Sequence, residues 1–333
     1  MTRDWSRAPP ALIHPFEGNG DFMAQAIAYI SRDTDGVLWQ KVLEAAIGPL
    51  DFRRLDSLGD KAGIEVALAW KPAPGLLASF PNLKLIVSLG MGVDHLLSDD
   101  KLPAHVPITR IMDDGLIGQM SEYALYWALR HHRDIDKYAA SQRARKWKVE
   151  DFVDTIHRRI GILGLGTIGQ DTAKKFAALG FPVAGWSRTA KNLSGIKTFH
   201  GADGFTRLLA ESDIVVNVLP LTRETRGILD DKAFASLPKG AYVINMARGG
   251  HVVDEALLAA LDSGHLSGAA LDVFNQEPLP GDHPYWAHPK VQVTPHIAGA
   301  TNPRTASPGV IENIKRLRSG GELLHRIDPK IGY

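Results

Sequence analysis

The sequence of 333 residues contains no cysteine. Disulfide bonds, thiolate chemistry and cysteine-ligated zinc or iron–sulfur centres are therefore excluded. Long apolar stretches are absent too, because no run reaches the roughly 18 residues that a membrane-spanning helix needs. The first residues carry charge and lead into no apolar core of a signal peptide, so we expect a cytoplasmic protein that binds no membrane.

An excess of charge of one sign is also missing, since 38 lysine and arginine residues are balanced by 37 aspartate and glutamate residues. The net charge of +1 gives no electrostatic reason to expect binding to nucleic acid. The histidines lack the spacing of helical metal-binding motifs, so we expect no metal. With 44% apolar and 23% charged residues, the composition is typical of a globular protein, and the length suits about two domains.

A glycine-rich turn is the first feature that points to a function. Residues 160–169 read IGILGLGTIG, in which Gly164, Gly166 and Gly169 have the G-x-G-x-x-G spacing of a dinucleotide-binding turn. An apolar strand precedes it and a helix is predicted over residues 170–179, so that amides at the helix start can bind a pyrophosphate. A turn with a structural role alone is the alternative. The residues assigned to the pyrophosphate are Gly164, Leu165, Gly166, Thr167, Ile168 and Gly169.

The end of the next predicted strand, over residues 181–186, distinguishes NAD from NADP. An acidic residue there would hold the ribose hydroxyls of NAD. The sequence instead reads WSRT over 186–189 and provides a hydroxyl and a guanidinium, which can bind a 2′-phosphate. We therefore expect NADP(H) as the preferred cofactor and NAD(H) as a second one, unless Arg188 is a solvated surface residue. The residues assigned to this end of the cofactor are Ser187, Arg188, Thr189 and Lys191.

The remaining pattern is that of an α/β protein. Apolar runs too uniform for burial on one face alternate with helical patterns, which predicts doubly wound parallel sheets that bind ligands at the carboxyl ends of their strands. The predicted strands lie at residues 66–70, 85–89, 159–163, 181–186, 214–219, 242–245, 269–273 and 291–293, and a further short strand lies within residues 103–110. The predicted helices lie at residues 22–30, 37–46, 119–133, 170–179, 204–210, 231–236, 253–262 and 310–324, and residues 138–154 form a connector or an arm that packs on another subunit.

Charged side chains follow three successive predicted strands. Arg248, Glu277 and His296 come shortly after the strands that end at residues 245, 273 and 293. Each side chain alone is more often structural or solvated, but together they gather where the nicotinamide of a bound dinucleotide is expected. Further residues at the ends of predicted strands, among them the strand at residues 214–219, are assigned to the cofactor, with the last of them on the nicotinamide side: Leu219, Pro220, Ala247 and Asp272.

The three charged residues fit the interconversion of a ketone and an alcohol. His296 would donate a proton to a carbonyl oxygen as hydride arrives, and remove it in the reverse direction. Glu277 would orient the imidazole and favour its protonated form. Arg248 would clamp a carboxylate through two parallel hydrogen bonds and polarise the adjacent carbonyl.

The motifs around these residues resemble those of the D-2-hydroxyacid dehydrogenase family, in particular its glyoxylate/hydroxypyruvate reductase branch. The resemblance extends from about residue 60 to the end and implies that Arg248, Glu277 and His296 are the catalytic residues. The matching segments are GILGLGTIG at 161–169, WSRT at 186–189, NMARGG at 245–250, LDVFNQEP at 271–278 and TPHIA at 294–298.

The same resemblance assigns substrate-binding residues in the first part of the chain. Residues 90–92 read GMG after a predicted strand, and such a turn either exposes amides to a small carboxylate or only reverses the chain. The resemblance favours the first reading and assigns the substrate carboxylate to the Met91 and Gly92 amides. It also implies that Trp70 lines the substrate pocket, and that Arg248 and His296 contact the substrate.

The resemblance further implies two Rossmann-like domains with a cleft between them. A flavodoxin-like substrate domain is expected to combine residues 1–112 with 305–333, so that the C-terminal helix completes it. Residues 113–304 are expected to form the NADP-binding Rossmann domain. A homodimer built on the cofactor domains is implied as well.

The function that we expect is the NAD(P)H-dependent reduction of a small 2-oxo acid, glyoxylate or hydroxypyruvate, to the D-2-hydroxy acid. One alternative keeps the family and changes the substrate to phosphoglycerate, a bulky aromatic or branched 2-oxo acid, or phosphite. Another alternative is a non-catalytic protein that senses NADP(H) and reports it to a partner.

The cofactor assignment can be tested by exchanging the residues after the 181–186 strand. Replacement of Ser187 by Asp together with Arg188 by Ala is expected to shift the preference from NADP toward NAD, because it adds a carboxylate for the ribose and removes the cation for the phosphate. The measurement is the ratio of kcat/KM for the two cofactors, and an unchanged ratio would show that the assignment is wrong.

Overall fold

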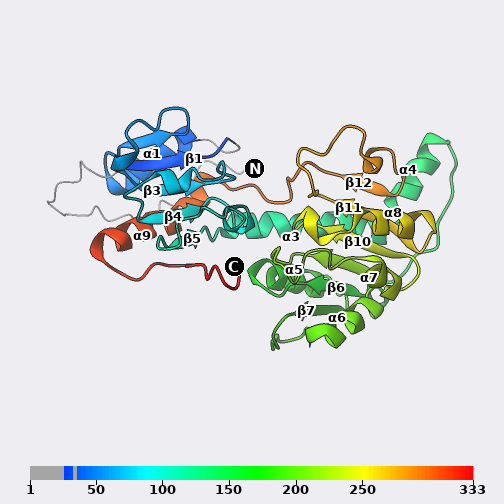
Figure 1. The fold of residues 1–333 in the computed structure, drawn as a ribbon. Coiled ribbons are helices and arrows are strands. Elements are labelled where there is room, and N and C mark those ends of the chain that lie inside the picture. The colour runs from blue at the N-terminus through cyan, green and yellow to red at the C-terminus, as the bar shows by residue number, and fades with distance from the viewer. Residues whose placement is uncertain (1–25, 33–35, 333) are drawn as a thin grey trace, which may run out of the picture. The chain divides into compact units, whose positions relative to one another are not determined.

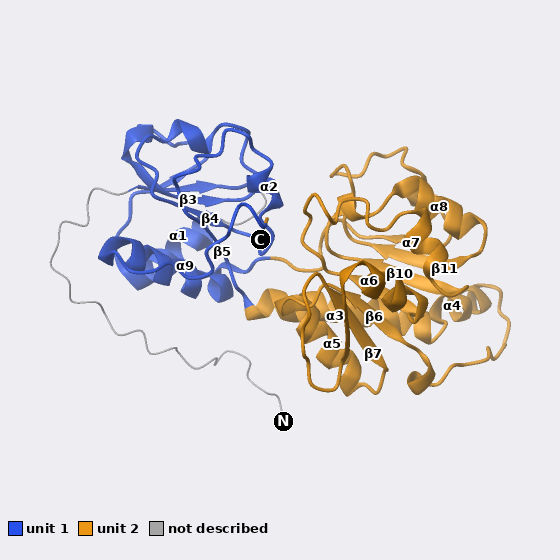
Figure 2. Ribbon diagram, turned by 60° about the horizontal axis from the view of Figure 1, so that its bottom comes forward, with its two compact units in different colours: residues 1–113, 301–331, 333 blue, residues 114–300, 332 orange. Residues whose placement is uncertain are grey.

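The structure is a computed structural model that describes residues 26–32 and 36–332. Figure 1 shows its helices and strands, and Figure 2 shows that the chain divides into two compact units. Unit 1 comprises residues 1–113 and 301–331, and unit 2 comprises residues 114–300. Each unit is built around its own parallel sheet, so the predicted α/β class with two doubly wound sheets is confirmed.

The sheet of unit 1 has five strands in the order β2-β1-β3-β4-β5. The order reverses beside β1, as in other doubly wound sheets. One face of the sheet packs on α1 (Gly36–Ile47) and α9 (Pro303–Ser319), and the other face packs on short turns and on α2 (Asp94–Leu97). The strands are β1 (Ala26–Ile30), β2 (Phe52–Arg54), β3 (Ile64–Ala69), β4 (Leu85–Ser88) and β5 (Ile108–Arg110).

The helix predicted over residues 22–30 is wrong within the described residues. Residues 22–25 lie outside them, and Ala26–Ile30 form strand β1 instead of a helix. All five residues of β1 are buried, because helices and turns cover both faces of the sheet. A short apolar run that is buried on every side shows no period that separates a strand from a helix.

The sheet of unit 2 has seven strands in the order β12-β11-β10-β9-β6-β7-β8, and all neighbours are parallel. The chain order reverses at β6, which pairs with β7 on one side and with β9 on the other. In an open sheet of this kind, ligands bind beyond the carboxyl ends of the strands near that reversal. The strands are β6 (Ile160–Leu163), β7 (Val183–Ser187), β8 (Lys197–His200), β9 (Ile214–Asn217), β10 (Ala241–Asn245), β11 (Leu266–Leu271) and β12 (Val291–Val293).

Helices cover both faces of this second sheet. Two of them, α3 (Asp114–His132) and α5 (Thr167–Ala178), pack on one face through Ala124, Trp127 and Phe176. The opposite face is covered by α6 (Gly201–Ala210), α7 (Asp231–Ser236) and α8 (Asp254–Asp262). A further helix, α4 (Ile135–Arg143), opens the segment that the sequence predicts as a connector or arm, and it contains no buried residue.

Two edge strands are missing from the prediction. The sequences of β2 and β8 are FRR and KTFH, which lack the apolar character of the central strands. Each lies at the border of its sheet, where a strand needs burial on fewer sides than a central strand does. Each of them therefore forms by pairing with a neighbouring strand, and its own sequence shows no periodic pattern that would mark it.

The last helix begins and ends earlier than the predicted range of residues 310–324. It begins at Pro303, where the Asn302 side chain accepts a hydrogen bond from the amide of Arg304, and it ends before Gly320, which has φ of +71°. These are ordinary capping devices at the two ends of a helix. Its apolar side, with Ala306, packs into unit 1 and so completes that unit with residues from the end of the chain.

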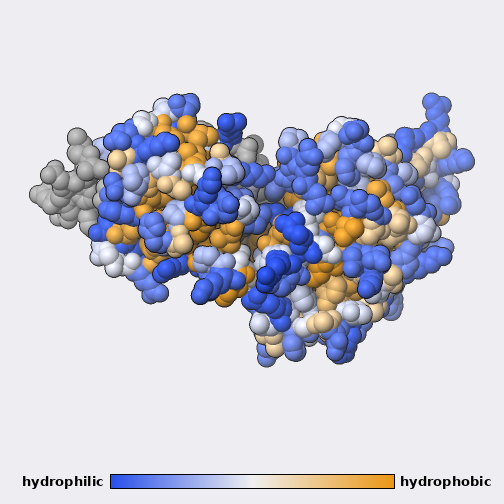
Figure 3. Space-filling view, viewed as in Figure 1, coloured by the Kyte–Doolittle hydropathy of each residue, from blue (hydrophilic) through white to orange (hydrophobic). Residues whose placement is uncertain are grey.

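The surface in view is largely hydrophilic, with apolar residues between the polar ones (Figure 3). Among the described residues, no helix combines the length and the apolar character that crossing a membrane requires.

Candidate active site

The glycine turn between β6 and α5 has the geometry of a phosphate-binding turn. Gly164 has φ of +103°, a conformation that other residues avoid. A Cβ on Gly169 would lie 1.7 Å from the carbonyl oxygen of Gly164, so the close contact of helix and strand requires glycine there. A Cβ on Gly166 would meet nothing within 4 Å, so open space lies beside the residue that precedes the helix. Twelve-residue α5 begins at Thr167, and its N-terminus favours an anion.

The residues after β7 form a turn that carries cations and no carboxylate. Arg188, Thr189 and Lys191 are exposed, whereas Ser187 is buried. The Ser187 hydroxyl donates to the carbonyl oxygen of Thr189 at 2.8 Å, which holds the turn closed. The Lys191 carbonyl accepts a hydrogen bond from the Thr198 hydroxyl, so this segment is fixed against β8. The exposed cations suit a 2′-phosphate, whereas the Ser187 hydroxyl could donate to such a phosphate only by sharing or giving up its bond to Thr189.

Two buried asparagines join the carboxyl ends of β9 and β10. Asn217 and Asn245 have no solvent exposure, and the Asn217 amide nitrogen donates to the Asn245 side-chain oxygen at 3.0 Å. The Asn217 oxygen accepts from the amide of Leu219 at 3.2 Å. On the next strand, the Asn245 oxygen accepts from the Ala247 amide, and its nitrogen donates to the Arg248 carbonyl. This pair therefore fixes the backbone of both turns that follow the strands.

A close backbone contact joins the turns after β10 and β11. A Cβ on Gly249 would lie 1.9 Å from the carbonyl carbon of Phe274 and 2.2 Å from the nitrogen of Asn275, so no larger residue fits there. The Phe274 amide in turn donates to Oε1 of Glu277 at 3.2 Å. The turn that carries Arg248 is thus packed directly on the turn that carries Glu277.

The imidazole of His296 is hydrogen-bonded to the Glu277 carboxylate. Nδ1 of His296 lies 2.9 Å from Oε2 of Glu277, and both side chains are partly buried. An acceptor at Nδ1 fixes the proton there in the neutral ring and leaves Nε2 for exchange with a ligand. His296 has φ of +57°, which is uncommon for a residue with a side chain.

Asp272 holds the segment that carries His296. Its carboxylate is completely buried and accepts from the Thr294 hydroxyl at 2.6 Å, the Ile297 amide at 2.9 Å and the Ala298 amide at 2.8 Å. Its carbonyl accepts from the His296 amide at 2.8 Å. The sequence predicts a cofactor contact for Asp272, which stays a prediction. The structure adds that the carboxylate already serves the 294–298 segment.

This support continues into helix α3. The Tyr123 hydroxyl lies 2.7 Å from the Thr294 hydroxyl, which itself donates to Asp272. Burial raises the pKa of Tyr123, so the phenol stays neutral and can donate to Thr294. A chain of hydrogen bonds thus leads from α3 through Thr294 and Asp272 to the backbone at His296.

The residues predicted to bind substrate in the first part of the chain lie in unit 1. Trp70 follows β3, and its ring packs 4.4 Å from that of His95. A Cβ on Gly90 would lie 2.3 Å from the Trp70 ring, so the indole lies directly against the turn of residues 90–92. The Met91 carbonyl accepts from Nη1 of Arg110, and the Gly92 carbonyl accepts from the Ser88 hydroxyl. Both carbonyls are therefore held within the unit.

The sequence assigns no role to four residues of these networks, namely Tyr123, Asn217, Asn245 and Thr294. A signal existed for the two asparagines, because a polar residue that ends a buried apolar strand needs a partner. The others are ordinary residues in their local context. Among the described residues, no group of three or more histidine, aspartate or glutamate side chains could hold a metal ion.

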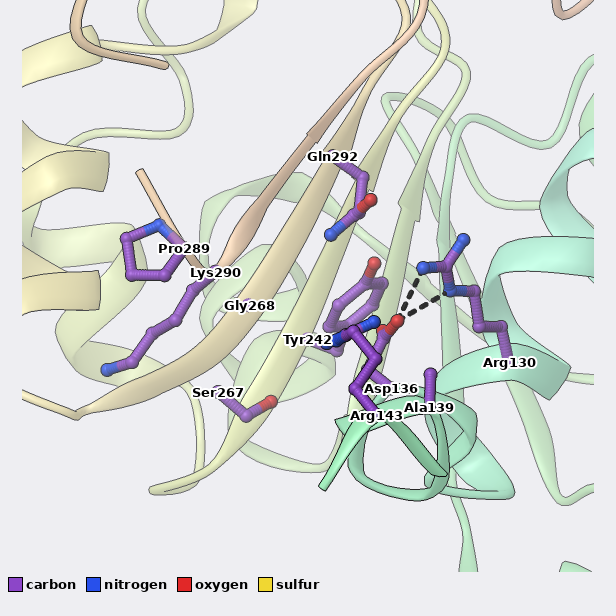
Figure 4. A pocket seen from close by; sticks show the side chains of 10 residues that line it. All are labelled: Arg130, Asp136, Ala139, Arg143, Tyr242, Ser267, Gly268, Pro289, Lys290 and Gln292. Carbon is purple, nitrogen blue, oxygen red and sulfur yellow. Dashed lines mark hydrogen bonds and ion pairs between the residues drawn. The ribbon is translucent and has the colours of Figure 1, made fainter. Parts of the chain in front are cut away.

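A pocket of about 400 Å³ lies elsewhere in unit 2 (Figure 4). Its residues from β10, β11 and β12 are near the starts of these strands, whereas Arg248, Glu277 and His296 follow strand ends. Figure 4 shows the ion pair of Arg130 with Asp136 at its border. This pocket is therefore separate from the residues described above. It is lined by Arg130, Asp136, Ala139, Arg143, Tyr242, Ser267, Gly268, Pro289, Lys290 and Gln292.

The chain is similar in sequence to known proteins and matches a family model. A family model described as D-isomer specific 2-hydroxyacid dehydrogenase, NAD binding domain, matches residues 125–298. The glyoxylate/hydroxypyruvate reductase A of Serratia proteamaculans is 42% identical over 280 residues, which are 83% of this chain and 90% of that protein.

Solved structures are similar over nearly the whole chain. A D-isomer specific 2-hydroxyacid dehydrogenase from Xanthobacter autotrophicus, in complex with NADPH and MES, has a TM-score of 0.88 and 45% identity, and the match covers 92% of this chain and 99% of that one. An NADPH-dependent glyoxylate/hydroxypyruvate reductase from Sinorhizobium meliloti, in complex with NADP and sulfate, has a TM-score of 0.87 and 36% identity, with coverage of 93% and 100%.

The glycine turn offers a matched pair of variants. Gly169→Ala is expected to lower the midpoint of thermal unfolding, because overpacking against the Gly164 carbonyl costs about 1–3 kcal/mol or more. Gly166→Ala is expected to leave that midpoint unchanged, since its methyl group enters open space, but to weaken NADPH binding on the order of tenfold, which corresponds to 1.4 kcal/mol. Thermal unfolding and fluorescence titration with NADPH measure the two effects. Equal behaviour of the two variants would contradict the separate roles.

Proposed function

The chain belongs to the D-isomer specific 2-hydroxyacid dehydrogenase family, and we propose that it reduces glyoxylate or hydroxypyruvate to the D-2-hydroxy acid with NADPH. The observation that carries the reaction is the 2.9 Å hydrogen bond between His296 and Glu277 beyond the carboxyl ends of the unit 2 strands. The curated relative from Serratia proteamaculans has this activity in its name, and the similar Sinorhizobium meliloti enzyme is NADPH-dependent.

The residues of the glycine turn fit the cofactor. The open space at Gly166 and the N-terminus of α5 suit a pyrophosphate, and Leu165, Thr167 and Ile168 provide backbone beside it. We propose that Ser187, Arg188, Thr189 and Lys191 receive the 2′-phosphate. The further cofactor contacts that we propose are at Leu219, Pro220, Ala247 and Asp272, so that residues 113–304 serve as the cofactor domain and residues 1–112 with 305–333 as the substrate domain.

Proton transfer is assigned to His296. When bound, NADPH supplies the hydride that reduces the carbonyl carbon of the substrate. His296 donates the proton of Nε2 to the carbonyl oxygen, while the hydrogen bond from Nδ1 to Glu277 stabilises the charged ring before the transfer. The Asp272 bonds keep the backbone at His296 in place during this exchange.

Substrate binding is assigned to one cation and to backbone amides. Arg248 binds the carboxylate bidentately and, because its charge lies beside the carbonyl, stabilises the oxygen as negative charge develops. From unit 1, the Met91 and Gly92 amides are assigned to a substrate carboxylate, and Trp70 is assigned to the lining of the substrate pocket. A short 2-oxo acid is favoured over a bulky one by the similarity to glyoxylate/hydroxypyruvate reductases.

We also propose a homodimer formed through unit 2. Large apolar side chains are exposed on α3, α4 and the segment that follows, and a patch of this kind typically marks a protein interface. Trp147 is 100% exposed and Phe152 is 78% exposed. The pocket of Figure 4 begins next to this segment, at Arg143. The cytoplasm is the proposed location.

The catalytic assignments predict distinct losses of activity. His296→Ala is expected to lower kcat by roughly 10²- to 10⁴-fold, the usual contribution of an acid–base group, without loss of NADPH binding. Arg248→Ala is expected to lower kcat/KM by roughly 10²- to 10³-fold, because the substrate carboxylate loses its cation. Absorbance at 340 nm with NADPH and a panel of short, branched and aromatic 2-oxo acids measures both variants.

Arg207→Ala is the matched control, because Arg207 is an exposed residue of α6 on the face opposite to α3. Its activity should equal that of the unchanged protein. Full activity of Arg248→Ala would refute the carboxylate clamp. A preference for bulky 2-oxo acids would refute the substrate proposal while leaving the family unaffected.

The dimer proposal is tested by sedimentation. The double variant Trp147→Ser/Phe152→Ser is expected to sediment with the mass of one chain, 36.3 kDa, and the unchanged protein with twice that mass. Loss of two large apolar anchors removes much of the energy of an interface. Val37→Ser removes an exposed apolar side chain of unit 1 and should leave the dimer intact. An unchanged protein that sediments as a monomer would disprove the proposal.

A further inference from the structure

His251 bridges two adjacent strand ends at the ligand-binding edge of unit 2. It lies in the short turn η4 (Gly249–His251), three residues after Arg248, and it has no solvent exposure. Its Nδ1 is 3.1 Å from the carbonyl oxygen of Arg248, and its Nε2 is 3.2 Å from the carbonyl oxygen of Pro220. The first carbonyl follows β10 and the second follows β9.

The count of donors around these carbonyls assigns the proton of the ring. A neutral imidazole has one N–H donor, and a carbonyl oxygen has two lone pairs. The Arg248 carbonyl already accepts from the Asn245 side chain at 3.0 Å and from the His251 amide at 3.3 Å. The Pro220 carbonyl accepts from the Thr225 hydroxyl at 2.7 Å, which leaves one lone pair for Nε2–H. The bond between the strand ends is therefore assigned to Nε2.

The two joined turns carry different parts of the proposed reaction. Arg248 is assigned to the substrate carboxylate, and Pro220 is assigned to the cofactor. The Asn217–Asn245 bond of 3.0 Å ties the same strands at their last residues. With His251 the two turns are connected at a second point, beyond the end of the sheet, where strand pairing no longer holds them.

We propose that His251 is a positioning residue for the carboxylate clamp. Its Nε2–H bond to Pro220 holds the turn of Arg248 in register with the cofactor-binding turn, so that the guanidinium is aligned with the substrate when the cofactor is bound. His251 acts through Arg248 and takes no proton from the substrate. This inference rests on the proposed function, because it requires Arg248 to bind the substrate.

Three variants test the Nε2–H bond of the ring. His251→Gln places an amide nitrogen close to the position of Nε2 and keeps the donor to Pro220. His251→Asn places its amide nitrogen close to the position of Nδ1 and leaves Pro220 without this donor. His251→Leu also removes the donor to Pro220 and retains an apolar side chain of similar size. For each variant, KM and kcat are measured with NADPH and glyoxylate, and the Kd of the unreactive dicarboxylate oxalate is measured in the NADPH complex.

The positioning role of His251 predicts an ordered series of effects on substrate binding. His251→Leu and His251→Asn should raise the KM for glyoxylate and the Kd of oxalate about tenfold, which is the scale of one buried hydrogen bond. The Kd of NADPH alone should change by no more than about twofold, which is less than the change expected from the loss of one hydrogen bond. His251→Gln should recover most of the loss, because it restores the bond to Pro220.

A second histidine of unit 2 provides the control for loss of stability. Nε2 of His265 lies 2.9 Å from the Phe234 carbonyl, just before β11 and far along the strands from their carboxyl ends. His265→Leu should lower the midpoint of thermal unfolding and leave the Kd of oxalate unchanged. An effect of His265→Leu on oxalate equal to that of His251→Leu would overturn the positioning role in favour of general destabilisation.

The remaining outcomes are also decisive. Equal Kd values for the Gln and Asn variants would overturn the inference, and this comparison stands even where the Leu variant fails to fold. If the unchanged protein reduces 2-oxo acids and all three variants match it, the positioning role alone is refuted. If the unchanged protein reduces no 2-oxo acid with NADPH, the proposed function fails instead.

Discussion

The buried carboxylate of Asp272 is the interaction on which the candidate active site depends. A carboxylate without solvent is stable only when donors surround it, and here the donors are the Thr294 hydroxyl and the amides of Ile297 and Ala298. Satisfying this one group therefore shapes the segment that contains His296. The positive φ of His296 has an energetic cost, which these hydrogen bonds offset. The orientation of the imidazole toward Glu277 follows from that backbone.

The rest of the ligand-binding edge in unit 2 is organised by two kinds of contact. Close backbone approach at Gly169 and Gly249 brings a helix and a turn against their neighbours without an intervening side chain. Buried polar side chains, such as Asn217 and Asn245, form hydrogen bonds with backbone groups that strand pairing leaves without a partner. Both kinds are rigid, and a rigid support suits catalytic groups because misplacement by a fraction of an ångström lowers the rate.

Several features were predictable because they depend on short stretches of sequence. The glycine spacing at 164–169 and the cations after β7 indicate a dinucleotide site through local chemistry. The strand-end positions of Arg248, Glu277 and His296 follow from the rule for parallel sheets. Other features depend on partners that are distant in the sequence. The sequence pattern predicts a helix where Ala26–Ile30 form a strand, since only burial on both sides by other segments distinguishes the two.

The sequence by itself determined the fold class, the family, the cofactor motif and the residues that carry the proposed chemistry, because each is written in local spacing and composition. Tertiary structure alone decided how those residues are held. His251 meets a carbonyl 31 residues away, and Asp272 meets amides 25 and 26 residues away, since β9 pairs with β10 and β11 pairs with β12. Strand order sets which polar groups become buried neighbours, and burial then makes their hydrogen bonds obligatory.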